Sequence, residues 1–298
     1  MTKVVKILLQ TTIPTTEDDW SITRFSMLHS YMTSLKDESE NPLFDVTARD
    51  RISDSQGNDP VLSTLDKSDF DELWLFALDM GDGLTEKDVA GINAFRQRGG
   101  GILSTRDHQD MGSSMTELID IGDIHYFHTI NQDPDDSRCC RDDPYTEYIS
   151  YPNYHSGANG DYQKITVMEP VHELMKNPDS PGGVIELFPS HPHEGGIGVD
   201  GGQSLTPALV VALGKSIVTG REFNLVVAID HYKDEKGNFL GRAIANSSFH
   251  HLVDYNWDTN KGCPTFVDEA PGEGMTKEPR ALEDIKRYVR NAALWLAN

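Results

Sequence analysis

Short apolar runs alternate with segments of helical period along most of this 298-residue chain. The run LWLFAL, residues 73–78, has the continuous apolar character of a central strand that is covered on both faces. A chain that alternates in this way is typical of an α/β fold with a mainly parallel sheet. The same pattern predicts strands at residues 4–9, 44–49, 102–105, 184–188, 208–213, 225–230 and 242–247.

Three segments carry the apolar stripe of an amphipathic helix. The first covers residues 25–35 and the last covers residues 282–296. Between them, Thr85 with Asp88 three residues later resembles a capping box, and the triple glycine that begins at Gly99 ends the helix. We find no internal repeat and no linker that would separate domains, so the sequence predicts a single domain over residues 1–298.

The regular pattern fails between residues 122 and 164, where Asp, Pro, Asn, Gly and Tyr dominate. A loop of this length is uncommon in a compact domain unless it covers a site. The sequence leaves two interpretations open for this insertion: a lid over a functional site, or an excursion over the surface.

The charge of the chain limits its partners. Asp and Glu number 48 against 26 Lys and Arg, a formal charge of -22, and this negative potential repels nucleic acids and anionic membranes. The four-residue apolar run before Gln10 is too short for a signal peptide or a spanning helix. We therefore expect a cytoplasmic protein with a small polar molecule as its partner, and the sequence leaves open whether the chain forms a homo-oligomer.

Ionisable residues follow the strand predicted at residues 102–105. Arg106, Asp107 and His108 leave the carboxyl end of this strand, and ligands of open α/β sheets bind at that edge. A surface salt bridge between Arg106 and Asp107 is the alternative interpretation.

Two further histidine clusters are candidates for the same edge. In the segment SHPHE, His191 and His193 are two residues apart, so in an extended segment both rings would point the same way, and Glu194 adds a carboxylate. His250 and His251 follow the last predicted strand, and adjacent residues of a strand face opposite ways, so we expect one of the two in the crevice.

Other polar groups fit an active site less well. Asp230 and His231 precede a predicted hairpin turn at residues 233–238 and are expected to be peripheral. Ser247, with His250 and Asp254, has the residue types of a serine hydrolase, but no G-x-S-x-G elbow is present.

The unit LWLFALDMGDGLTEKDVAGINAFRQRGGGILST, its polar elbow and the late segment GRAIANSSFHH resemble the class I glutamine amidotransferase-like superfamily. Within it, the chain is most similar to the trehalose-utilisation ThuA-like branch and related uncharacterised bacterial proteins. The resemblance covers roughly residues 3–257, apart from the insertion. It implies a flavodoxin-like three-layer α/β/α sandwich with the functional elbow at residues 105–108, and it suggests a carbohydrate-derived substrate.

The elbow departs from the pattern of true glutaminases, which carry a cysteine nucleophile there. None of Cys139, Cys140 and Cys263 follows a strand in a G-x-C-x-G setting, so cysteine-dependent glutaminase activity is not expected. ThuA-like proteins also lack this cysteine and bring polar residues to the crevice, a role that the resemblance assigns to Asp107 and His108.

These patterns lead to one functional hypothesis and one alternative. The hypothesis is a hydrolase-like or lyase-like enzyme that uses a histidine and carboxylate site, with or without a divalent metal such as zinc. The alternative is a non-catalytic binding or assembly protein on the same fold. The expected site consists of Arg106, Asp107, His108, His193, Glu194 and His250, and the candidate metal ligands are His108, His191, His193, His250 and His251.

Overall fold

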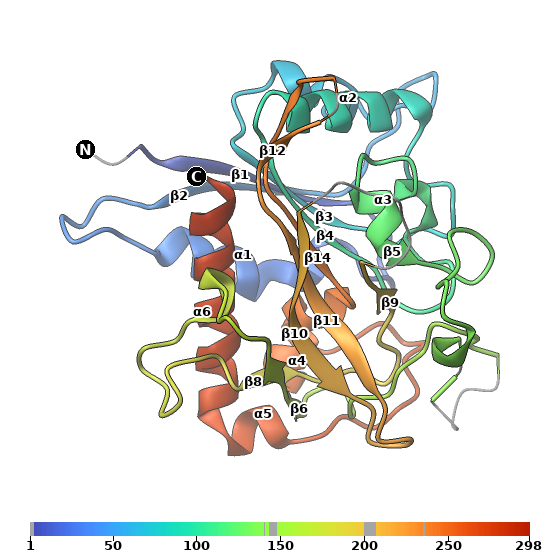
Figure 1. Ribbon diagram of the computed structural model, residues 1–298, viewed down its shortest axis with the longest axis vertical. Coiled ribbons are helices and arrows are strands. Elements are labelled where there is room, and N and C mark those ends of the chain that lie inside the picture. The colour runs from blue at the N-terminus through green and yellow to red at the C-terminus, as the bar shows by residue number, and fades with distance from the viewer. Residues whose placement is uncertain (1–2, 140, 143–147, 200–206, 235) are drawn as a thin grey trace.

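An eight-stranded sheet runs through the middle of the molecule in the order β2-β1-β3-β4-β14-β11-β10-β7 (Figure 1). The computed structural model describes residues 3–139, 141–142, 148–199, 207–234 and 236–298. Neighbouring strands from β2 to β14 are parallel, and β11, β10 and β7 extend the sheet with antiparallel pairings. The strands are β1 (Val5–Thr11), β2 (Phe44–Arg49), β3 (Glu72–Phe76), β4 (Gly101–Thr105), β7 (Thr166–Val167), β10 (Ala208–Lys215), β11 (Glu222–Ile229) and β14 (Ala243–Asn246).

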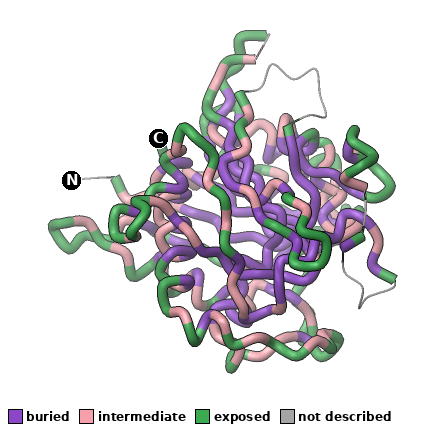
Figure 2. The backbone as a smooth tube through the Cα atoms, turned by 60° about the horizontal axis from the view of Figure 1, so that its bottom comes forward, coloured by how far each residue is buried: buried purple, intermediate pink, exposed green. Residues whose placement is uncertain are grey.

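Side chains of β3 alternate between the two faces of the sheet, as the pleat requires. Trp74 and Phe76 enter the core cluster that contains side chains of α1 (Ser26–Ser34), α4 (Asp254–Trp257) and α6 (Pro279–Leu296). Leu73 and Leu75 enter the cluster that contains side chains of α2 (Glu86–Gln97), α3 (Ile121–Ile124) and the 3₁₀ helix η2 (Leu62–Lys67). Figure 2 shows the strands buried between these two layers. The predicted three-layer α/β/α sandwich with a mainly parallel sheet is therefore confirmed.

The α-helices are α1 (Ser26–Ser34), α2 (Glu86–Gln97), α3 (Ile121–Ile124), α4 (Asp254–Trp257), α5 (Gly274–Lys277) and α6 (Pro279–Leu296). The 3₁₀ helices are η1 (Ile22–Phe25), η2 (Leu62–Lys67), η3 (Ser113–Met115), η4 (Asp136–Arg138), η5 (Glu173–Met175), η6 (Phe249–Leu252) and η7 (Thr259–Lys261). Among the described residues, we find no helix with both the length and the apolar character needed to cross a membrane.

The start of α2 confirms the predicted cap. The Thr85 hydroxyl accepts from the Asp88 backbone N–H, and the Asp88 carboxylate accepts from the Thr85 N–H. The helix ends before Gly99, whose φ of +98° lies in the left-handed region that favours glycine.

The strand predicted at residues 184–188 is wrong in its place and extent. Only Leu187–Pro189 forms a strand, β8, and it pairs with β6 (Tyr162–Lys164) outside the central sheet. The physical reason lies in α6, where the carboxylate of Asp284 accepts hydrogen bonds from the backbone N–H groups of Glu186 and Leu187, both at 2.9 Å. These donors are therefore not available to a neighbouring strand.

The insertion at residues 122–164 is anchored by short pairings in its described part. Its β5 (His125–Tyr126) pairs with β9 (Gly196–Ile197), and its β6 pairs with β8. The predicted hairpin around Gly237 is also present, between β12 (Tyr232–Lys233) and β13 (Phe239–Leu240). The pairing of β5 with β9 joins the insertion to the segment that directly follows His191 and His193.

Candidate functional site

Two neighbouring parallel strands end at the same edge of the sheet. Thr105 of β4 pairs with Asn246 of β14, and both strands stop at this point. Asp107 and His250 lie a few residues beyond these ends, so the sheet itself brings together segments far apart in the sequence.

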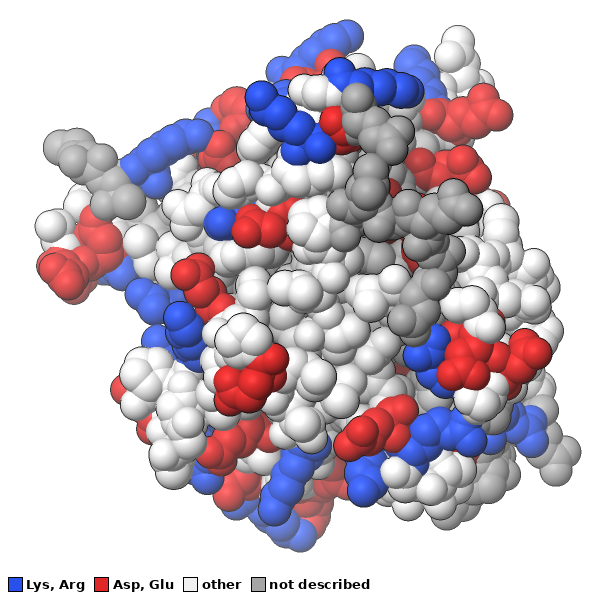
Figure 3. Space-filling model, viewed as in Figure 1, with Lys and Arg blue, Asp and Glu red and all other residues white. Residues whose placement is uncertain are grey.

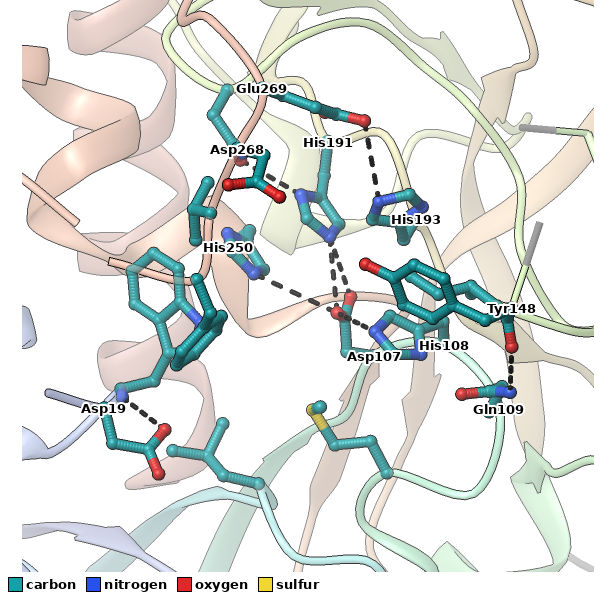
Figure 4. A pocket seen from close by; sticks show the side chains of 17 residues that line it. Asp19, Asp107, His108, Gln109, Tyr148, His191, His193, His250, Asp268 and Glu269 are labelled. Carbon is teal, nitrogen blue, oxygen red and sulfur yellow. Dashed lines mark hydrogen bonds and ion pairs between the residues drawn. The ribbon is translucent and has the colours of Figure 1, made fainter. Parts of the chain in front are cut away.

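A pocket of about 460 Å³ opens at this edge (Figure 4). The insertion supplies Tyr148, Ile149 and Asn159 to its wall, which makes this part of the insertion a wall of the site and not a surface excursion. The other described lining residues are Asp19, Trp20, Leu78, Asp107, His108, Gln109, Met111, His191, His193, His250, Phe266, Val267, Asp268 and Glu269.

The Asp107 carboxylate, 2% exposed, lies at the centre of the polar part of the pocket. His191 Nε2 is 3.1 Å from its Oδ1 and 3.3 Å from its Oδ2. Nε2 of His108 and Nε2 of His250 lie 3.7 and 3.9 Å from Oδ2. The Ser248 hydroxyl donates to Oδ1 at 3.1 Å, which fixes the orientation of the carboxylate from the β14 side.

His191 Nδ1 lies 3.0 Å from the side-chain oxygen of Asn159. A neutral His191 carries its ring proton either on Nδ1, toward Asn159, or on Nε2, toward Asp107. In the second form Nε2–H donates to the Asp107 carboxylate. In the first form the lone pair of Nε2 faces the carboxylate at 3.1 Å, an arrangement that a cation between the two acceptors would stabilise.

Burial opposes protonation of these rings. It holds the pKa of His191 well below its ordinary value, and the neighbouring His193 and His108 act in the same direction. Burial likewise holds the pKa of His250 well below its ordinary value, with a further contribution from His191. Burial also lowers the pKa of His108, although Asp107 partly opposes the shift. Burial therefore favours the neutral imidazole, which is the form that binds metals.

The three ligand atoms of Asp107, His191 and His250 lie within 4.8 Å of one another. With metal-ligand bonds of about 2.0 to 2.1 Å, the ligand atoms of a tetrahedral zinc site are separated by about 3.3 Å. The separation of 3.1 Å between Asp107 and His191 is close to this value, whereas that of 3.9 Å between Asp107 and His250 is longer. The two histidine rings are stacked at 10° to each other, so they must turn for both to bind one ion with Asp107.

His108 and His193 flank this cluster on the pocket side, with ring centroids 5.5 Å apart. His193 Nδ1 is 3.3 Å from the Asn153 side-chain oxygen, and its Nε2 lies 3.8 Å from a Glu269 oxygen. Figure 4 shows both rings beside Asp107, on a different side of it from His250.

The structure places Arg106 away from the pocket. Its side chain is fully buried, its guanidinium lies over the Phe127 ring at 4.3 Å, and it donates to the backbone oxygen of Gln109 at 2.5 Å. Burial lowers its pKa to about 9. The expected position of Arg106 in the crevice is therefore wrong, because its side chain does not line the pocket. The alternative of a surface salt bridge with Asp107 is also wrong, because both side chains are buried.

Glu194 and His251 also lie outside the described pocket lining. His251 Nε2 contacts Glu194 Oε1 at 3.0 Å, and both side chains are fully buried. The structure thus brings only His250 of the adjacent pair into the pocket, although the two residues lie in η6 and not on a strand. Glu194 is not in reach of the pocket as a metal ligand.

The H-x-H segment forms a turn and is not extended. His191 and His193 both reach the pocket, but their rings are nearly perpendicular, with an interplanar angle of 85°. The expected extended conformation is therefore wrong, although both side chains reach the same pocket. Asp230 and His231 form an exposed pair outside the pocket, with a separation of 3.2 Å.

Neither the serine candidate nor a described cysteine supplies a nucleophile to the pocket. The Ser247 hydroxyl donates to Glu194, and Asp254 accepts from Ser26, so these residues do not form a triad with His250. The thiols of Cys139 and Cys263 lie outside the pocket lining, and Cys140 lies outside the described residues.

Sequence reasoning missed several pocket residues. Asn159, whose side-chain oxygen lies 3.0 Å from His191 Nδ1, has a neutral side chain in an irregular segment and carries no motif. Asp19, Asp268 and Glu269 lie in loops of a chain with many acidic residues, so their composition gave no signal.

Comparison with solved structures shows the fold of the chain. A ThuA-like protein from Parabacteroides merdae matches with a TM-score of 0.51 at 17% identity over 99% of this chain and 91% of that protein. The N-terminal domain of mmIFT52 has a TM-score of 0.50 at 13% identity over 98% and 97%. The glutaminase domain of Trypanosoma brucei CTPS, with bound acivicin, has a TM-score of 0.43 at 12% identity over 96% and 94%.

No protein-family model and no curated protein matches the sequence. The comparison therefore shows that this chain has an α/β fold similar to that of the Parabacteroides merdae ThuA-like protein. Its structural neighbours include ThuA-like proteins, as the sequence resemblance implied. At these identities the likeness concerns the fold alone.

Proposed function

We propose that Asp107, His191 and His250 bind a divalent metal ion such as zinc, and that the protein is a hydrolase-like or lyase-like enzyme. The observation that carries this proposal is the approach of His191 Nε2 to the Asp107 carboxylate at 3.1 Å, with His250 Nε2 3.9 Å from the same carboxylate. A divalent ion would bind the carboxylate and a ring nitrogen at once.

Asp107, His191 and His250 would hold the ion and leave room for water or substrate, as in catalytic zinc sites. The ion would supply a nucleophile at neutral pH by lowering the pKa of a bound water. His108 and His193 would accept and donate protons beside it.

We propose a small polar substrate without phosphate or carboxylate groups. Anion sites rely on Arg and Lys, and none lines the pocket among the described residues. The side chains of Tyr148, 80% exposed, and Phe266, 56% exposed, border the pocket and offer flat apolar faces to a sugar ring. A neutral carbohydrate-derived molecule meets these conditions.

The surface charge supports a small-molecule partner over a nucleic acid. On the face in Figure 3, Lys and Arg side chains are interspersed with Asp and Glu and do not form one continuous basic patch. We also propose a cytoplasmic location, with which the free thiols of Cys139 and Cys263 agree.

Metal analysis of the purified protein tests the proposal. We expect about one zinc per chain in the parent, and loss of the metal in Asp107→Ala and His191→Ala. His231→Ala, which removes an exposed histidine outside the pocket, is the matched control and should keep the metal. A parent protein that binds no divalent ion and turns over no substrate from a panel of neutral sugars and amides would favour the non-catalytic binding alternative.

A further inference from the structure

Glu194 is a fully buried carboxylate that lies behind the pocket, on the turn that carries His191 and His193. Its own backbone N–H and C=O pair with Tyr154 of the insertion at 2.8 and 3.0 Å. An ionisable group without access to solvent is costly to bury unless its oxygens are satisfied. Its contacts therefore need an explanation.

Four side chains surround the two carboxylate oxygens. Ser247 Oγ donates to Oε2 at 2.7 Å. Gln163 Nε2, Ser156 Oγ and His251 Nε2 contact Oε1 at 2.7, 2.9 and 3.0 Å. These partners come from the insertion and from the segment after β14, so one carboxylate joins two parts of the chain to the His191 turn.

The first route from Glu194 leads to His191. The Ser156 hydroxyl that contacts Glu194 also accepts a hydrogen bond from the His191 backbone N–H at 2.9 Å. The same hydroxyl lies 3.1 Å from the His191 backbone oxygen, so its one proton has two acceptors, Glu194 and that oxygen. The Ser156 hydroxyl thereby links the Glu194 carboxylate to the backbone of His191.

Two other routes lead to the remaining members of the cluster. Ser247 precedes Ser248, whose hydroxyl donates to Asp107 and accepts from the His250 backbone N–H, both at 3.1 Å. His251 directly follows His250 in η6. The contacts of Glu194 with Ser247 and His251 therefore fix the segment of residues 247–251. This segment contains His250, and its Ser248 contacts Asp107.

We infer that Glu194 is a positioning residue, which holds His191 and His250 against Asp107 without touching the pocket itself. The effect on metal affinity rests on the metal site proposed above, whereas the effect on the two histidine rings does not. Partners behind metal ligands typically change metal affinity by 10-fold to 100-fold when they are removed.

The test compares zinc affinity in the parent, Glu194→Gln and Glu194→Ala. We expect the dissociation constant to rise by about 10-fold to 100-fold for the alanine variant. The rise should be smaller for glutamine, which keeps the shape and one acceptor oxygen. Glu72→Gln is the matched control, because Glu72 is an equally buried carboxylate that accepts from Trp74 at 2.8 Å and lies away from the pocket. Ser156→Ala provides a second, milder variant if Glu194→Ala does not fold.

Two spectroscopic readouts separate positioning from a general loss of stability. With Co²⁺ in the site, the visible absorption bands should shift in Glu194→Gln and in Ser156→Ala but not in Glu72→Gln. In the metal-free protein, the ring ¹⁵N signals of His191 and His250 should move in the same two variants.

The outcomes distinguish the two proposals. If the parent binds no zinc, the proposed function fails, and the ¹⁵N signals alone decide the role of Glu194. If folded Glu194→Gln and Ser156→Ala keep the parent's zinc affinity, or if their histidine ¹⁵N signals stay unchanged, Glu194 does not position the cluster.

Discussion

The imidazole rings of His191 and His250 stack on each other, with centroids 3.6 Å apart and an angle of 10° between their planes. The Trp20 ring meets the edge of His250, with centroids 4.7 Å apart. In this packing, Nε2 of each histidine lies on the side of the Asp107 carboxylate. A substitution that disturbs the stacked rings therefore also changes the positions of the two nitrogen atoms that face Asp107.

Replacing His250 separates its packing from its donor atom. Phenylalanine keeps a flat ring between His191 and Trp20 but cannot bind a metal, so we expect His250→Phe to lose zinc while its free energy of unfolding stays within about 1.5 kcal/mol of the parent. Alanine removes the ring contacts as well and should cost more. Zinc analysis and urea unfolding measure the two effects. A phenylalanine variant that retains zinc would contradict the role of His250 as a ligand.

Added zinc should stabilise the folded protein. A ligand at 100 times its dissociation constant contributes about 2.7 kcal/mol, which corresponds to a rise in Tm of roughly 5 °C in a protein of this size. A chelator should reverse the shift, and Asp107→Asn should abolish it because one ligand loses its charge. Differential scanning calorimetry measures this effect. An equal zinc shift in Asp107→Asn would show that the ion binds elsewhere.

Gly195 lies where the ends of β4 and β14 approach the His191 turn. A Cβ at this position would lie 2.5 Å from the Asp107 backbone oxygen and 2.7 Å from that of Ser247. Backbone atoms cannot move aside cheaply, so we expect Gly195→Ala to lower the free energy of unfolding by about 1 to 3 kcal/mol and to weaken zinc binding.

The control for Gly195 is Gly182→Ala, whose Cβ would meet the end of the flexible Glu186 side chain at 2.8 Å. Urea unfolding of both variants gives the comparison. If the two substitutions cost the same, the close approach at Gly195 does not constrain the site.

Stability should fall as the pH drops below about 6.5. Burial holds the pKa of His125 well below its ordinary value, whereas in the unfolded chain the pKa is about 6.5. Below pH 6.5 the unfolded state therefore binds a proton that the folded state does not, and stability is lost at up to about 1.4 kcal/mol per pH unit for this residue.

His125→Gln tests this dependence. His125 Nε2 lies 2.9 Å from the Ser104 hydroxyl, and a glutamine can keep a hydrogen bond there without titrating. Urea unfolding at pH 7, 6 and 5 should show a shallower loss of stability in the variant. An unchanged slope would mean that other groups, such as His191 and His250, account for the whole dependence.

Much of the fold could be predicted from hydrophobic period and turn residues. The strand expected at residues 44–49 has the bounds of β2, and the Thr85 cap starts α2 as predicted. These signals are local, so a single segment contains them. The strand at residues 184–188 failed because a distant side chain, Asp284, takes its backbone donors.

The candidate site was predictable in residue types and only partly in geometry. Parallel neighbouring strands end at the same edge of a sheet, and this brings Asp107 and His250 together, as the sequence suggested. The sequence does not show which histidine of SHPHE faces Asp107, because the conformation of that turn depends on the contacts of Glu194 with Ser156. Nor can it show that Arg106 turns away to stack on Phe127.

The place of β14 in the sheet has a consequence for how the chain assembles. β14 lies between β4 and β11, yet it comes much later in the sequence than β4. Until β14 docks, the parallel unit of β2, β1, β3 and β4 exposes an open edge of unpaired backbone groups. Truncated chains that stop before residue 243 should therefore self-associate through β4 and precipitate.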